Sequence, residues 1–114
     1  LCHLEIPATI AMALRGEILL DNGTMPGAGV IALAKHDLKP GDRIDRALGG
    51  FQCRGEAVPF SWHHQHPPIG LLQNVVVEKS VEAGTAIRWD QISLPESRAL
   101  TLFRQLLQKT QQAD

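Results

Sequence analysis

Near the start of the chain, apolar residues recur with the spacing of one helical face. Ile6, Ile10 and Leu14 fall at i, i+4 and i+8 in the segment IPATIAMALRG. Pro7 suits the first turn of a helix, and Gly16 is placed to end one. The pattern predicts a short helix with an apolar face that needs a partner.

A Gly-rich segment, DNGTMPGAG at residues 21–29, separates this helix from the rest of the chain. Its Asp-Asn step, Pro26 and its glycines are typical of turns and linkers. The neighbouring sequence supplies little to cover the apolar face of the helix. We therefore expect that face to dock onto something outside this chain.

Strand patterns follow at VIALA (residues 30–34), at VVVEK (75–79) and at ISL (92–94). Between the first two, the segment FQCRGEAVPFSWHHQHPP is poorly patterned, and only residues 51–53 suggest a further strand. Residues 67–74, with a proline pair and a glycine, predict a tight turn with a single helical turn. The chain is thus predicted to be mainly β in its middle.

After Pro95 ends the last strand, Ser97 can cap a helix that runs from Arg98 to about Gln108. A local turn at residues 89–91 precedes that strand. The helix carries an apolar stripe made of Ala99, Leu102, Phe103, Leu106 and Leu107. The predicted organisation is a helix with a linker (1–29), a β domain (30–95) and a C-terminal helix with its tail (96–114), which is α+β overall.

One short pattern occurs twice, 43 residues apart. Shifting the chain by that length places LKPGDRI, residues 38–44, on VEAGTAI, residues 81–87. Each copy has a strand, a charged residue or two, an apolar residue, an x-x-Gly turn and a closing apolar residue. Gly41 and Gly84 stand at the corners, where a positive φ would make a Cβ clash. Two such units can share a core that neither could bury alone, which predicts a duplicated hairpin.

The length and composition of the chain fit one soluble domain. The chain has 114 residues, of which 44% are hydrophobic and 20% are charged, an ordinary composition for a folded protein. A net charge of −1 gives no electrostatic reason to expect nucleic acid or an anionic membrane as a partner. No apolar run reaches the roughly 18 residues that a membrane span needs. Cys2 and Cys53, with no Cys-x-x-Cys spacing, predict free thiols, and with no leader pattern we expect a cytoplasmic protein.

The order of these motifs resembles the SAF domain, the antifreeze-like β-clip module of sialic acid synthases, altronate dehydratases and flagellar or pilus assembly chaperones. The resemblance is carried by VIALAKHDLKPGDRI and by PPIGLLQNVVVEKSVEAGTAI, in which Gly70 belongs to a Pro-Ile-Gly-Leu turn. The opening HLEIPATIAMALRGE and the closing ISLPESRALTLFRQLLQ extend it. Together they resemble the C-terminal part of the homoserine dehydrogenase-like NAD(P)-dependent oxidoreductases.

That resemblance implies a mainly β, SAF-like β-clip fold with short flanking helices, preceded by a Rossmann domain that binds NAD(P). No G-x-G-x-x-G follows a strand in this chain, so we expect it to bind no cofactor itself and to lack catalytic residues. The chain departs from the family pattern at His36, Phe51 and Pro67, where Arg, Tyr and Leu are usual. Completing the parent's substrate site, or joining subunits of a homo-oligomer, is its expected work.

Charged residues of both signs gather around the two predicted turns. Lys35, His36 and Asp37 border the first turn, while Lys79 and Asp90 belong to the second unit. The lysines would attract an anion and the carboxylates would accept hydrogen bonds from hydroxyl groups. Such a set could bind a sugar acid, as in a stand-alone antifreeze-like module, or form the solvated rim of a hairpin. An assembly chaperone of the flagellar or pilus kind is the third alternative.

A histidine cluster, HHQH, supplies the other candidate chemistry. His63, His64 and His66 carry imidazoles, which bind zinc or copper, and Cys53 or Glu56 could add a ligand. The spacing matches no established metal-site pattern, and the following Pro-Pro step favours a surface loop. We expect a solvated loop here, with a metal site as the alternative.

Overall fold

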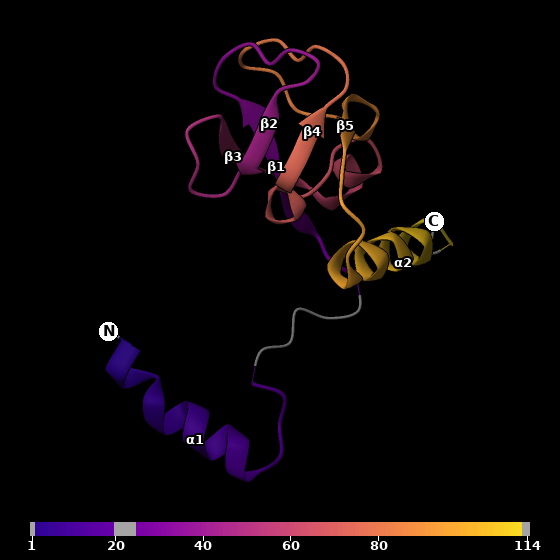
Figure 1. The fold of residues 1–114 in the computed structure, drawn as a ribbon. Helices are drawn as coiled ribbons and strands as arrows, with labels where there is room; N and C mark the ends of the chain where they lie inside the picture. Colours follow the sequence, from indigo (N-terminus) through magenta and orange to yellow (C-terminus); the bar gives the residue numbers. More distant parts are fainter. Residues whose placement is uncertain (1, 20–24, 113–114) are drawn as a thin grey trace.

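The computed structural model describes residues 2–19 and 25–112. They contain two antiparallel sheets and two α-helices, joined by loops and short 3-10 helices (Figure 1). In the first sheet, β1 (Ala28–Ala34) pairs with β3 (Cys53–Pro59), with Ala28 opposite Pro59 and Ala34 opposite Cys53. This mixed content agrees with the predicted α+β class.

The second sheet has the order β2-β4-β5. Its strands are β2 (Arg43–Arg46), β4 (Gln73–Val77) and β5 (Ile92–Ser93), and both pairings are antiparallel. Between the sheets, the main chain of β1 also bonds to residues 84–87, since Ala34 N donates to Thr85 O at 3.0 Å and Ile87 N donates to Ala32 O at 2.9 Å. β1 therefore has β3 on one side and this extended segment on the other.

The 43-residue repeat of the sequence is a pseudo-two-fold relation in the structure. Leu38 and Val81, which are equivalent in the two copies, exchange main-chain hydrogen bonds of 2.9 and 3.0 Å. Gly84 N donates to Ala34 O at 2.7 Å, and the equivalent Gly41 N donates to Val77 O at 2.8 Å. Each copy completes the hydrogen bonding of the other, which supports the predicted duplication. The predicted hairpin does not form, because β1 and β2 lie in different sheets.

Both turn glycines adopt the predicted left-handed conformation. The φ angle is 95° at Gly41 and 79° at Gly84, a region that side chains disfavour. The turns close in the same way, with Asp42 N donating to Lys39 O and Thr85 N donating to Glu82 O. Gly70 differs, since it lies in the 3-10 helix Ile69–Leu71 and its φ is not positive.

The main apolar cluster lies where the two copies meet, and a smaller one forms around Ile31, Leu33 and Val58. Ile44 and its equivalent Ile87 are both 0% exposed, and Leu72 and Val75 are as fully buried. Most members of the main cluster come from the repeat units or from the short 3-10 helix before β4. The core therefore depends on the duplication, because both copies contribute fully buried side chains to the same cluster.

The strand β3 corrects the sequence prediction. Residues 51–53 were expected to form the strand, but it begins at Cys53 and runs to Pro59, and Phe51 lies outside it with 92% of its surface exposed. Only Cys53 and Val58 of the strand are buried. Since most of its side chains face solvent, the strand has no apolar alternation for a sequence pattern to detect.

The N-terminal helix forms as predicted and remains uncovered. α1 (Ile6–Leu14) follows a 3-10 turn at Cys2–Leu4, has Pro7 in its first turn, and ends before Gly16, whose φ is 69°. None of its residues is buried, and the helix lies away from the two sheets in Figure 1. Ile6, Ile10 and Leu14 are 55%, 54% and 84% exposed.

The C-terminal helix packs on the 3-10 segments beside the sheets, where Phe103 meets Phe60, His63 and Trp89, but through a face shifted from the predicted one. α2 (Arg98–Gln112) begins after Ser97, whose Oγ accepts a hydrogen bond from Leu100 N at 3.1 Å, so the predicted cap is confirmed. Leu100 and Thr110 are buried, whereas Leu102 is 53% exposed. The docked face follows Leu100, Phe103, Leu107 and Thr110, at helical spacings of three, four and three.

Candidate functional site

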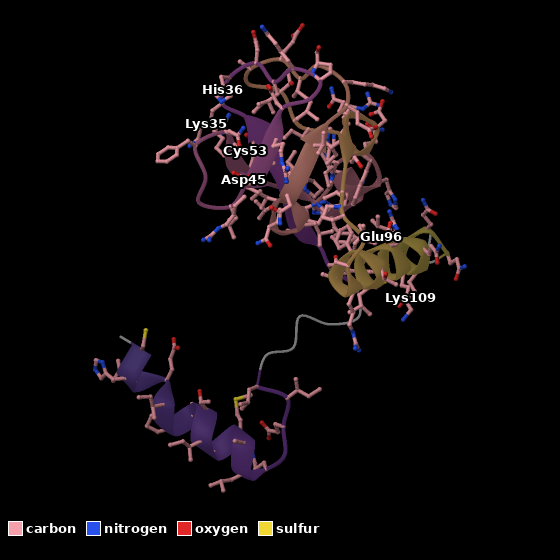
Figure 2. All side chains as sticks on the ribbon, viewed as in Figure 1. Lys35, His36, Asp45, Cys53, Glu96 and Lys109 are labelled. Carbon is pink, nitrogen blue, oxygen red and sulfur yellow. The ribbon has the colours of Figure 1, made fainter. Side chains whose placement is uncertain are left out.

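The charged residues of the first turn are engaged by the main chain. Asp37 Oδ1 accepts a hydrogen bond from Ala83 N at 2.8 Å, which ties the first copy of the repeat to the turn of the second. His36 Nδ1 lies 3.1 Å from Asp37 O and can donate to it. Lys35 and His36 lie at the end of the sheets far from α2 (Figure 2). Asp37 is therefore part of the junction between the copies as well as of the rim.

The charged residues of the second unit form an ion-pair cluster. Asp90 accepts from Lys79 Nζ at 3.1 Å, and Arg88 Nε lies 3.2 Å from its other carboxylate oxygen. The hydrogen bond from Lys79, with the charges of Lys79 and Arg88, holds the pKa of Asp90 below its usual value. All three side chains are more than half exposed, so this cluster stabilises the fold only slightly.

The two groups do not converge on one site. Within residues 2–19 and 25–112, no hydrogen bond or ion pair joins Lys35 or His36 to Lys79 or Asp90. The contact between the two units is made by Asp37, through the main chain of Ala83, and not by these four side chains. The arrangement shows a rim of separate charges around the two turns rather than a single ligand-binding pocket.

The histidine cluster corrects a second prediction, since it is not a solvated loop. The 3-10 helix Phe60–His64 buries His63, which is 1% exposed, and the following Pro67 is fully buried. His63 Nδ1 donates to the carbonyl of His66 at 2.9 Å, and Trp89 Nε1 donates to the carbonyl of His63 at 2.8 Å. These bonds satisfy polar groups that would otherwise be costly to bury.

The ring of His63 lies between the sheet and α2. It meets Phe60 and Phe103 edge-on, with centroid distances of 5.2 and 5.3 Å, an arrangement that aromatic pairs prefer. Its Nε2 lies directly against the backbone of Gly29, where a Cβ would come within 1.9 Å. Gly29 is therefore required for close approach, and His63 acts as a packing residue between β1 and α2.

The other two histidines are held by different partners. His66 Nδ1 donates to the carbonyl of Ile87 at 2.9 Å, and its ring packs on Trp62 with a centroid distance of 5.7 Å. His64 is exposed, with Nδ1 3.3 Å from Gln111 Nε2 of α2. Across the described residues, no three His, Cys, Asp or Glu side chains gather closely enough to hold a metal ion. The sequence cluster is thus divided among three separate environments.

His64 borders three hollows on this side of the molecule. One of about 410 Å³ is lined by Ser61, Trp62 and His66, and one of about 250 Å³ lies toward β3. A third, of about 440 Å³, lies between β5 and α2. Its lining comprises His64, Trp89, Ile92, Leu94, Arg104 and Leu107. Arg104 was not singled out from the sequence, because a lone arginine on a helix is indistinguishable there from a solvated one.

Both cysteines are free, as predicted. Cys53 lies in the core, where burial raises the pKa of its thiol, and the charge of Lys35 opposes that shift. A thiol whose pKa is raised carries less thiolate and is a poorer nucleophile. Figure 2 shows Cys53 on the sheet below Lys35. Its position supports the role of a small core side chain.

Comparison with known proteins adds no relative. No protein-family model matches this chain, and no curated protein matches it significantly. Within the described part of the chain, no helix has the length and apolar character needed to cross a bilayer. The function must therefore be argued from the geometry of these residues.

Proposed function

We propose that this chain is a non-catalytic, SAF-like β-clip module of a cytoplasmic, homoserine dehydrogenase-like oxidoreductase that uses NAD(P). In that enzyme the module completes the substrate site of a preceding Rossmann domain or holds subunits together. The duplicated unit supports the proposal, since Gly41 and Gly84 form equivalent turns in the order that the SAF resemblance implies. The two free thiols are consistent with a reducing compartment.

The observation that carries the proposal is the uncovered helix α1. Its apolar side chains Ile6, Ile10 and Leu14 are all more than half exposed. An isolated helix of nine residues is unstable in water, and packing of its apolar face normally supplies the stability. A polypeptide that covers α1 would account for the apolar face of this helix, and the Rossmann domain is the partner that the resemblance implies.

A rigid loop between β2 and β3 offers a second contact. Phe51 is 92% exposed and Leu48 is 58% exposed. Gly50 lies so close to the Arg46 carbonyl that a Cβ would come within 2.1 Å, and Gln52 is tied to Arg43 O at 2.9 Å. An aromatic side chain on a loop held at both ends can anchor an interface at little entropic cost.

Reconstitution tests this proposal. The region encoded upstream of this chain is expressed as a separate polypeptide and mixed with it. We expect a stable complex by light scattering, with coenzyme turnover in the mixture and none with this chain alone. Ile10→Asp should abolish the complex by placing a charge on the apolar face. Phe51→Ala should weaken it about tenfold or more, the effect of truncating an aromatic interface anchor.

Matched controls separate interface effects from misfolding. Thr9→Asp adds the same charge to the same exposed helix at a polar position and should leave the complex intact. The unfolding free energy should be unchanged by Ile10→Asp and by Phe51→Ala, because neither side chain is buried. Coenzyme turnover by this chain alone, or two polypeptides that do not associate, would overturn the proposal.

A further inference from the structure

We propose that the hollow between β5 and α2 binds a small carboxylic acid that carries an aromatic or branched apolar group. This site is independent of the proposed function, since it uses neither α1 nor the charged rim of the turns. Its volume of about 440 Å³ lies within the usual range for small-molecule sites. The inference rests on the chemistry of its floor and of its rim.

The floor of the hollow is apolar. Ile92 is buried, and Leu94 and Leu107 are partly buried against the sheet and along α2. The ring of Trp89 also lines the hollow. Its Nε1 is already bonded to the carbonyl of His63, so the indole presents no free hydrogen-bond donor to a ligand. A ligand that reaches this floor gains by removing apolar surface from water and by stacking on the indole, rather than by hydrogen bonds.

The rim supplies hydrogen-bond donors. Arg104 contacts Glu96 at 3.1 and 3.3 Å through Nη1 alone, which leaves the donors on Nε and Nη2 for another acceptor. His64 Nδ1 lies 3.3 Å from Gln111 Nε2, and the tautomer in which Nδ1 accepts this bond carries its proton on Nε2. The rim therefore carries two donor side chains, Arg104, which is always cationic, and His64. A ligand with a carboxylate and an apolar group complements the rim with the first and the floor with the second.

Glu96 opposes that binding and thereby makes it testable. It lies just before α2 (Figure 2), and its exposed pair with Arg104 has little energetic value in water. A bound carboxylate competes with it for the same guanidinium. Removing the charge of Glu96 should therefore strengthen binding, whereas removing the charge of Arg104 should weaken it.

The experiment is an NMR titration of the full chain with phenylacetate, and with phenylacetamide as the neutral analogue. We expect saturable shifts of the Trp89 Nε1–H signal with phenylacetate and much weaker ones with the amide. Arg104→Gln should weaken phenylacetate binding about fivefold to tenfold, and Glu96→Gln should strengthen it about twofold to threefold. Arg54→Gln is the matched control, because Arg54 forms a similar exposed pair with Glu56 on β3.

The outcomes divide cleanly. Loss of affinity in Arg104→Gln, gain in Glu96→Gln and no change in Arg54→Gln support the site. The proposal is overturned by phenylacetate shifts that do not saturate up to its solubility limit, by equal binding of phenylacetamide, or by unaltered affinity in Arg104→Gln. All three substituted side chains are exposed, so loss of folding does not obscure the result.

Discussion

The two copies of the repeat have the same backbone and different surfaces. Leu38 and Val81 exchange hydrogen bonds across the pseudo-axis, and Ile44 and Ile87 occupy equivalent, fully buried positions. At the solvated positions the charge changes sign, since Lys35 in the first copy corresponds to Glu78 in the second. The shared features are those that define the turn and the core, and the rim is free to diverge because it contributes little to folding.

The copies also differ in what surrounds them. β1 is bordered by the seven-residue β3, whereas β4 is bordered by the two-residue β5. His63 packs against Gly29, whose equivalent in the second copy is the buried Leu72. The hollow under α2 is lined by Ile92 and Leu94, from β5 and just after it. The surfaces that could carry function therefore lie where the symmetry is broken.

The largest expected effect concerns the shared core. Ile44→Ala and Ile87→Ala should each lower the free energy of unfolding by about 2–5 kcal/mol, since each removes a fully buried side chain. Urea denaturation measures both. If the copies are equivalent in packing, the two losses should agree within about 1 kcal/mol. A small loss for one alone would show that the core depends on only one copy.

The next effect concerns the broken symmetry at His63. Gly29→Ala should cost about 1–3 kcal/mol of unfolding free energy, because its Cβ would overlap the imidazole and displace a well-packed ring. Gly27→Ala, at a position where a Cβ meets nothing within 4 Å, is the control and should be nearly neutral. Equal stabilities of the two variants would contradict the packing role of His63.

Much of the fold could be predicted from the sequence because its signals are local. The turns at Gly41 and Gly84 require a residue that tolerates positive φ, and the Ser97 cap is a local hydrogen bond. β3 was missed because its order comes from pairing with β1, a contact distant in sequence that leaves no apolar period. Its side chains beyond Cys53 and Val58 face solvent.

The candidate site was harder to predict than the fold. The polar residues of HHQH favoured a surface loop, yet His63 is buried. The carbonyl of His66 accepts from its ring and the Trp89 indole donates to its carbonyl, so its polar atoms are satisfied. The charges at the two turns suggested one ligand site, yet Lys79 pairs with Asp90 in the second copy, while Asp37 of the first copy bonds to the main chain of the second. Sequence neighbours reveal which residues share a turn, but only the three-dimensional packing reveals which of them meet.

A smaller effect tests the equivalence of the turns. Gly41→Ala and Gly84→Ala should each destabilise the protein by about 1–2 kcal/mol, as an L-residue at positive φ is strained. No neighbouring atom lies within 4 Å of a Cβ at either glycine, so strain is the sole cause. Urea denaturation should return equal losses, and unequal losses would show that one turn relaxes more readily.

The smallest effect belongs to the ion pair that only the second copy has. Asp90 corresponds to Ala47 in the first copy, and its pKa is lowered chiefly by the hydrogen bond from Lys79. Because the folded pKa lies below the unfolded value of about 3.9, its stabilisation is complete above that value and is lost as the pH falls through the folded pKa. Asp90→Asn should therefore slightly flatten the acid limb of the profile of unfolding free energy against pH and leave the alkaline limb unchanged.

An NMR titration of the Asp90 carboxyl checks the direction of the pKa shift, and Lys79→Gln should move the pKa of Asp90 back toward the usual value. A carboxyl that titrates identically in both proteins would show that Lys79 does not lower the pKa of Asp90 in solution.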